Sequence, residues 1–99
     1  MEFTIKAKLT IVSERDGRIL IPGAIHSYTN TLLESFNSVK TKALLDGTMT
    51  KSKFITEVQK NGELMLGRLV ALHFISTHKD LSFGDPWVVN YDFMSLEIH

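Results

Sequence analysis

The chain contains no cysteine, and it has only two prolines among its 99 residues. Without cysteine it can form no disulfide, no zinc–thiolate site and no thiol nucleophile. Such a composition suits the cytosol, where thiols stay reduced, and we expect a cytoplasmic protein. The longest apolar run, residues 69–75, is interrupted by His73 and is far shorter than the roughly 20 residues that cross a bilayer. We therefore expect no membrane segment.

Neither sign of charge is in excess, because eleven basic residues balance eleven acidic ones. A dedicated nucleic-acid binder usually carries a clear basic surplus, so the balance argues against that class. The charges are unevenly spread, however. Lysines are concentrated in the middle of the chain, whereas the tail after Lys79 has no Lys or Arg and four carboxylates: Asp80, Asp85, Asp92 and Glu97.

No recognisable catalytic, metal-binding or nucleotide-binding motif is present. Gly62 and Gly67 stand in neither a Gly-x-Gly-x-x-Gly nor a Walker context, and residues 80–85 do not match a calcium loop. His73 and His78 are five residues apart, which directs them to different faces of a helix or a strand. They are therefore not expected to share a metal ion, and we expect no cofactor and no bound metal.

What the chain does contain is enough apolar residue, 43% of the sequence, to bury one modest core, and we expect a single domain over residues 1–99. Within Glu2 to Ser13, residues 2–11 alternate between polar and apolar, which predicts a half-buried antiparallel strand. A turn at residues 14–17 leads to a short second strand, Arg18 to Ile21, which we expect Pro22-Gly23 to stop.

The next segment, Ile25 to Leu44, is predicted to be an amphipathic helix ended by Asp46-Gly47. Its apolar residues recur at steps of three and four: Ile25, Tyr28, Leu32, Phe36, Val39 and Ala43. Leu33 and Leu44 widen the same stripe.

Thr50 to Thr77 allows two readings. Asn61-Gly62 suits a tight turn and could join two strands in a hairpin. As one helix, capped by Thr50 or Ser52, the same segment places its apolar residues on a single face, whereas the hairpin would leave residues 64–74 apolar on both faces. We favour the helix, although an internal Gly62 costs it roughly 1 kcal/mol.

The segment Trp87 to His99 alternates again, but its apolar face changes halfway, from Trp87 and Phe93 to Leu96 and Ile98. The strand is therefore expected to change its burial or to be covered on both sides. The predicted class is α+β, with about three antiparallel strands and two helices on one face, in the order β-β-α-α-β. The hairpin reading gives β-β-α-β-β-β instead.

The leading functional hypothesis is a small non-enzymatic protein that binds another macromolecule, such as an adaptor or an inhibitor of the kind that viruses and mobile elements encode. We expect its interface at the aromatic residues of the last third, Trp87, Tyr91 and Phe93, because Trp, Tyr and Met are enriched where proteins bind one another. A small sheet also exposes two edges, so pairing of the last strand into a homo-oligomer is expected.

Two alternatives belong to other classes. The first is a nucleic-acid-binding accessory protein that uses a lysine patch around the link between the helices: Lys40, Lys42, Lys51, Lys53 and Lys60. The second is a small enzyme whose site forms between subunits, with His26 or His73 as the general base.

Overall fold

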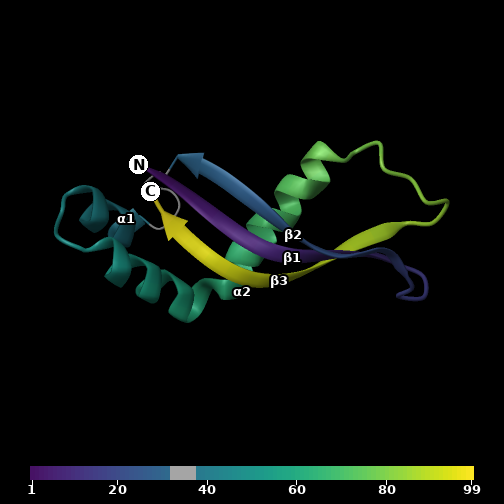
Figure 1. The fold of residues 1–99 in the computed structure, drawn as a ribbon, viewed down its shortest axis with the longest axis horizontal. Coiled ribbons are helices and arrows are strands. Elements are labelled where there is room, and N and C mark those ends of the chain that lie inside the picture. Colours follow the sequence, from purple (N-terminus) through teal and green to yellow (C-terminus); the bar gives the residue numbers. More distant parts are fainter. Residues whose placement is uncertain (32–37) are drawn as a thin grey trace.

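The computed structural model describes residues 1–31 and 38–99, which form an elongated molecule of 51 × 23 × 18 Å. Three antiparallel strands make one sheet in the order β2-β1-β3, with β1 (Glu2–Ser13) at its centre. The edges are β2 (Ile19–Thr31) and β3 (Trp87–Ile98), as Figure 1 shows. Two helices, α1 (Ser38–Leu45) and α2 (Lys51–Thr77), lie between β2 and β3 in the described sequence.

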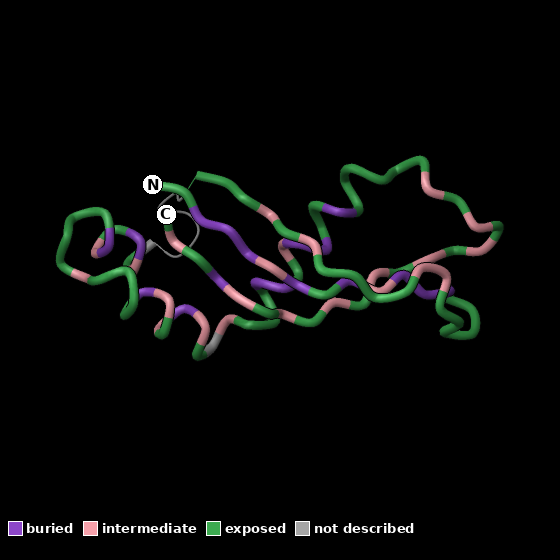
Figure 2. The backbone as a smooth tube through the Cα atoms, viewed as in Figure 1, coloured by how far each residue is buried: buried purple, intermediate pink, exposed green. Residues whose placement is uncertain are grey.

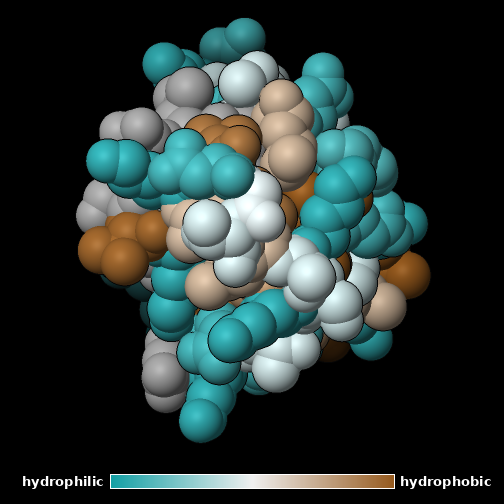
Figure 3. All heavy atoms as spheres, turned by 90° about the vertical axis from the view of Figure 1, so that its left-hand side faces the viewer, coloured by the Kyte–Doolittle hydropathy of each residue, from teal (hydrophilic) through white to brown (hydrophobic). Residues whose placement is uncertain are grey.

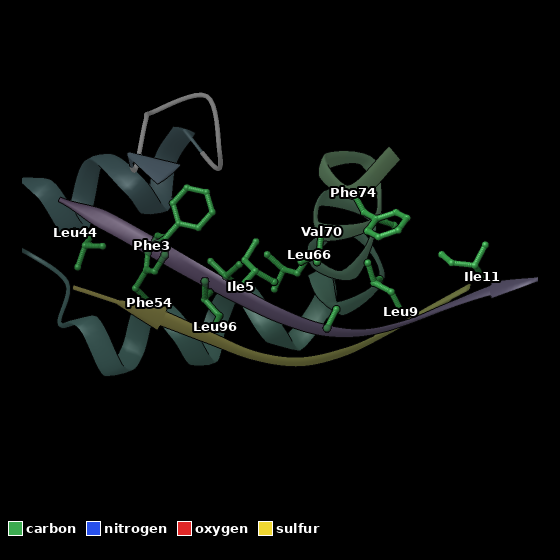
Figure 4. Packing of buried hydrophobic residues seen from close by; sticks show 13 residues of the cluster. Phe3, Ile5, Leu9, Ile11, Leu44, Phe54, Leu66, Val70, Phe74 and Leu96 are labelled. Atoms are coloured by element: carbon green, nitrogen blue, oxygen red, sulfur yellow. The ribbon is translucent and has the colours of Figure 1, made fainter. Parts of the chain in front are cut away.

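The α+β class and the order β-β-α-α-β are therefore confirmed for the described residues. In Figure 1, α2 crosses behind the sheet and α1 lies at the end where the chain begins and finishes. The core lies between β1 and α2 (Figure 4), and β1 supplies the longest buried stretch in Figure 2. Its most buried large side chains come from both layers: Ile5, Leu9, Ile11, Phe54, Leu66 and Val70.

The prediction for the second strand was wrong, because Pro22-Gly23 does not stop it. The strand β2 continues to Thr31, and its pairing with β1 slips by one residue on either side of Ile21. Proline is tolerated in edge strands and at bulges, where its missing N–H breaks no ladder bond. Because β2 is an edge strand with bulges at this point, Pro22 fits within it.

The helix predicted over Ile25 to Leu44 is correspondingly wrong in its first part, since residues 25–31 belong to β2. Residues 32–37 lie outside the described part of the chain. The last part is confirmed, because α1 ends next to Asp46-Gly47 as expected. Gly47 has a φ of 80°, and the N–H of Thr48 reaches the carbonyl of Ala43 at 2.9 Å. This is the Schellman arrangement that satisfies the last carbonyls of a helix.

The segment with two readings is one helix, so the hairpin alternative was wrong. The Thr50 side chain accepts a hydrogen bond from the N–H of Lys53 at 3.1 Å and caps the helix, as predicted. Figure 1 shows α2 changing direction partway along its length. Within residues 1–31 and 38–99, no helix combines the length and the apolarity needed to cross a bilayer.

The change of apolar face in β3 is explained by a bulge. Lys6 pairs with Ser95, whereas the next residue, Ala7, pairs with Phe93, so Met94 is an extra residue in β3. A bulge reverses the alternation of side chains from that point on. Leu96 therefore lies on the same core face as Phe93, and the strand is covered on one side only.

Candidate functional site

A groove lies between the middle of α2 and the edge strand β3. It has a volume of about 250 Å³, and its lining comes from both elements: Glu63 and Leu64 from α2, and Tyr91, Asp92 and Phe93 from β3. The groove is therefore lined by one leucine, two aromatic residues and two acidic residues.

The close approach of α2 to β3 depends on Gly67. A Cβ atom placed there would lie 2.8 Å from Cδ2 of Tyr91 and 3.5 Å from the backbone nitrogen of Phe93. Real Cβ atoms are essentially never found within 3.0 Å of another heavy atom, so the contact with Tyr91 would be too close. Only glycine therefore allows the Tyr91 ring to lie against the helix backbone, where the ring is held in place as part of the groove wall.

Large apolar side chains at or next to groove residues in the sequence are exposed. Leu64 is 78% exposed, and its neighbour Met65 is 48% exposed. Met94, the bulged residue next to Phe93, is 51% exposed. Of these three, Leu64 lines the groove itself, and Met65 and Met94 adjoin groove residues along the chain.

The structure divides the predicted interface residues. Tyr91 and Phe93 line the groove, and both are half-buried against the core. Trp87 lies at the other end of β3, where its Nε1–H donates to the carbonyl of Leu81 at 3.0 Å and ties down the loop before the strand. Leu64 was missed, because the helix pattern alone could not show that its side of α2 is left uncovered.

A second pocket, of about 150 Å³, lies between β2 and the C-terminal end of α2. Three histidines line it, His26 from β2 and His73 and His78 from α2 and its C-cap. The remaining lining residues are Ser27, Val70, Phe74 and Thr77. The structure thus brings together the two histidines proposed as general bases and adds a third.

The imidazole rings of this pocket are held by aromatic contacts. The ring of His78 stacks on the buried ring of Phe74, with 4.0 Å between centroids and 13° between planes. His26 meets the same phenyl ring edge-on at 5.2 Å, and His73 lies 4.9 Å from the ring of Tyr28. Phe74 therefore fixes two of the three imidazoles.

His78 was not expected to join His73, because a continuing helix would have separated them. Its backbone leaves the helical region, with φ −124° and ψ 39°, and so turns the ring back over the last turn of α2. Among the described residues, no group of three or more His, Asp or Glu side chains is arranged to hold a metal ion.

The predicted lysine patch is partly gathered. Lys42, Lys51 and Lys53 are exposed on α1 and the first turn of α2, at the same end of the molecule. Figure 3 looks onto this end and shows hydrophilic side chains over much of it. Lys40 lies 3.9 Å from the carboxylate of Glu57, so part of its charge is neutralised. Lys60 follows about two helical turns beyond Lys53.

Comparison of the chain with known protein families, with curated proteins and with solved structures finds no match. The function is therefore argued from these surfaces alone.

Proposed function

We propose that this chain is a non-enzymatic protein that acts by binding another protein at the groove between α2 and β3. The observation that supports this most is the exposure of Leu64, a large apolar side chain that lines the groove and is 78% exposed. Binding energy at interfaces is concentrated in a few residues, tyrosine among them, and Tyr91 lines the same groove as Leu64. Because a chain without cysteine needs no oxidising compartment, we place this binding in the cytoplasm.

The form of the partner follows from the sheet. The strand β3 is an edge, so one side of its backbone pairs with no other strand of the described residues. An extended segment of a partner can add to such an edge through backbone hydrogen bonds, with alternate side chains entering neighbouring pockets. The groove beside Tyr91 and Phe93 offers such a pocket.

The charge of the partner follows from the groove. Glu63 and Asp92 line it, and β3 carries no Lys or Arg, whereas Glu97 further along the strand is paired with Lys6 at 3.6 Å. Opposite charges on neighbouring strands stabilise their pairing, and like charges destabilise it. We therefore propose that the partner segment is extended and basic, with apolar side chains at alternate positions.

Self-association through the same edge is a weaker form of this binding. A second copy that paired its own β3 in antiparallel fashion would bring carboxylates of the two copies close together. Sedimentation velocity at high protein concentration should therefore show a minor dimer fraction, which increases in the Asp92→Asn variant. Sedimentation as a monomer alone in both proteins would contradict self-association.

The probe for partner binding is a fluorescent peptide as long as β3 in which valine and lysine alternate. Anisotropy should show saturable binding to the wild-type protein, and Leu64→Ser should weaken it by about tenfold, the effect of losing one apolar anchor. The control is Val39→Ser on α1, since Val39 is equally exposed, at 79%, and lies away from the groove. Equal binding by the two variants would count against the groove.

A second candidate, nucleic-acid binding, is supported by the exposed lysines Lys42, Lys51 and Lys53 at one end of the molecule. Each phosphate contact makes the logarithm of the affinity fall with the logarithm of the salt concentration, with a slope of about 0.9 for duplex DNA. Replacing Lys51 and Lys53 by glutamine should therefore reduce the slope by about two. A slope that does not change would remove this candidate.

A further inference from the structure

The histidine pocket has a composition that suits one class of small ligand. Its lining offers three imidazoles, and no carboxylate or ammonium group is among the residues that line it. The nearest part of the core, Val70 and Phe74, is apolar and closes one wall. An imidazole that gains a proton becomes a cationic donor on both nitrogens, and three such donors around one volume match a group with several oxygens.

The hydrogen bonds of His78 show that its Nδ1 is already occupied, by the Phe74 carbonyl and by Thr77 Oγ1 at 2.9 Å. Its Nδ1 lies 2.9 Å from the carbonyl oxygen of Phe74, and a carbonyl can only accept. We therefore assign a proton to Nδ1, which leaves Nε2 as the nitrogen free to bind. The same bond occupies one of the last carbonyls of α2, at the negatively polarised end of the helix.

From this geometry we propose that the pocket of His26, His73 and His78 binds a small tetrahedral oxyanion, a phosphate or sulfate group, and takes up protons as it does so. The Nε2–H of a protonated His78 then donates to one oxygen, and His26 and His73 donate from opposite elements. This site is separate from the groove at β3 and does not depend on the function proposed there.

The other polar groups near the rings are few. On α2 and the loop after it, Lys79 and Asp80 follow His78 directly, and on β2 the phenol of Tyr28 adjoins His73. The core face of β1 contributes apolar side chains, and β3 reaches this region through Trp87, which meets Phe74 edge-on at 6.4 Å. The histidines are therefore the groups of this pocket that can offer N–H donors to an anion.

The test uses sulfate, because its charge stays the same between about pH 5.5 and about pH 8 while that of histidine changes. Imidazole signals in two-dimensional NMR should shift saturably on addition of sulfate at the lower pH, for all three pocket histidines together. The affinity should fall at least about tenfold at the higher pH, since each proton taken up on binding changes it by up to tenfold per pH unit. Sodium chloride at equal ionic strength should leave the signals in place.

Two variants separate binding from folding. His73→Gln alters an exposed side chain and should weaken sulfate binding while preserving the dispersed backbone spectrum. His99→Gln is the control, because His99 bonds to Thr4 on the sheet and is not part of the pocket. Phenyl phosphate as a second probe distinguishes a phosphate monoester, bound more tightly than inorganic phosphate, from the free ion. Linear shifts shared by His99, or a response to zinc without a response to sulfate, would overturn the proposal.

Discussion

At the scale of single residues, the two glycines inside α2 have opposite surroundings. A Cβ atom at Gly62 would meet nothing within 4 Å, whereas at Gly67 it would meet the Tyr91 ring at 2.8 Å. Gly62→Ala should stabilise the protein by up to about 1 kcal/mol, the helix-propensity difference. Gly67→Ala should destabilise it by about 1–3 kcal/mol, because the ring must move out of a packed position. Urea unfolding of both variants measures this, and a stabilising Gly67→Ala would contradict the packing at the groove.

The stability of the folded chain depends on pH through the carboxyl group of Asp16. The backbone N–H of Arg18 donates to its carboxylate at 2.9 Å, and this bond lowers the pKa of Asp16 below its ordinary value of 3.8. Because the folded-state pKa is depressed, the stabilisation is present above that ordinary value and is lost as the pH falls through the folded-state pKa. Asp16→Ala should therefore unfold more easily than the wild type at neutral pH, and the difference should shrink below pH 3.8. A difference that is constant with pH would argue against the bond.

At the scale of elements, the bulge in β3 decides which side chains reach the core. Deleting Met94 removes the extra residue and leaves Phe93 and Leu96 on the same face. The deletion should therefore be tolerated, with a cooperative thermal transition. Deleting Asn90, which has a regular partner in Thr10, should invert the faces of β3 on one side of the cut and abolish that transition. Similar behaviour of the two deletions would show that the register is not set as described.

Elements with an undisturbed period were predictable from the sequence, and those with an irregularity were not. The period of two in β1 and the cap at Thr50 led directly to the observed strand and helix. The second half of β2 was missed because Ile25 and Tyr28 are three residues apart, a helical spacing, whereas in the strand Ile25 faces solvent and Tyr28 faces α2. Pairing with β1, a contact distant in sequence, overrides that local pattern.

The candidate sites were only partly predictable for the same reason. Tyr91 and Phe93 were identified from residue type, and the structure adds Leu64 from a distant element to form one groove. His26 and His73 were identified as single residues, but their convergence with His78 depends on how β2 lies against the end of α2. The sequence shows the chemical type of each residue. Which residues of distant elements come together is known only from the tertiary fold.

At the scale of the whole molecule, the candidate functional surfaces are distributed along one elongated body. The exposed lysines of α1 and the first turn of α2 lie at one end, and the groove and the histidine pocket involve different strands, β3 and β2. Our central proposal is that the chain binds a basic extended segment of another protein at the acidic groove and the exposed edge of β3. The charge of the groove can be reversed without disturbing the core, because Asp92 is exposed.

The most direct measurement is a charge exchange at the groove. Wild-type protein and the double variant Glu63→Lys, Asp92→Lys are each titrated with two peptides, one alternating valine with lysine and the other alternating valine with glutamate. The wild type should prefer the lysine peptide, and the double variant should prefer the glutamate peptide, with each preference weakened by salt. If the double variant keeps the wild-type preference while remaining folded, the partner does not bind at this groove.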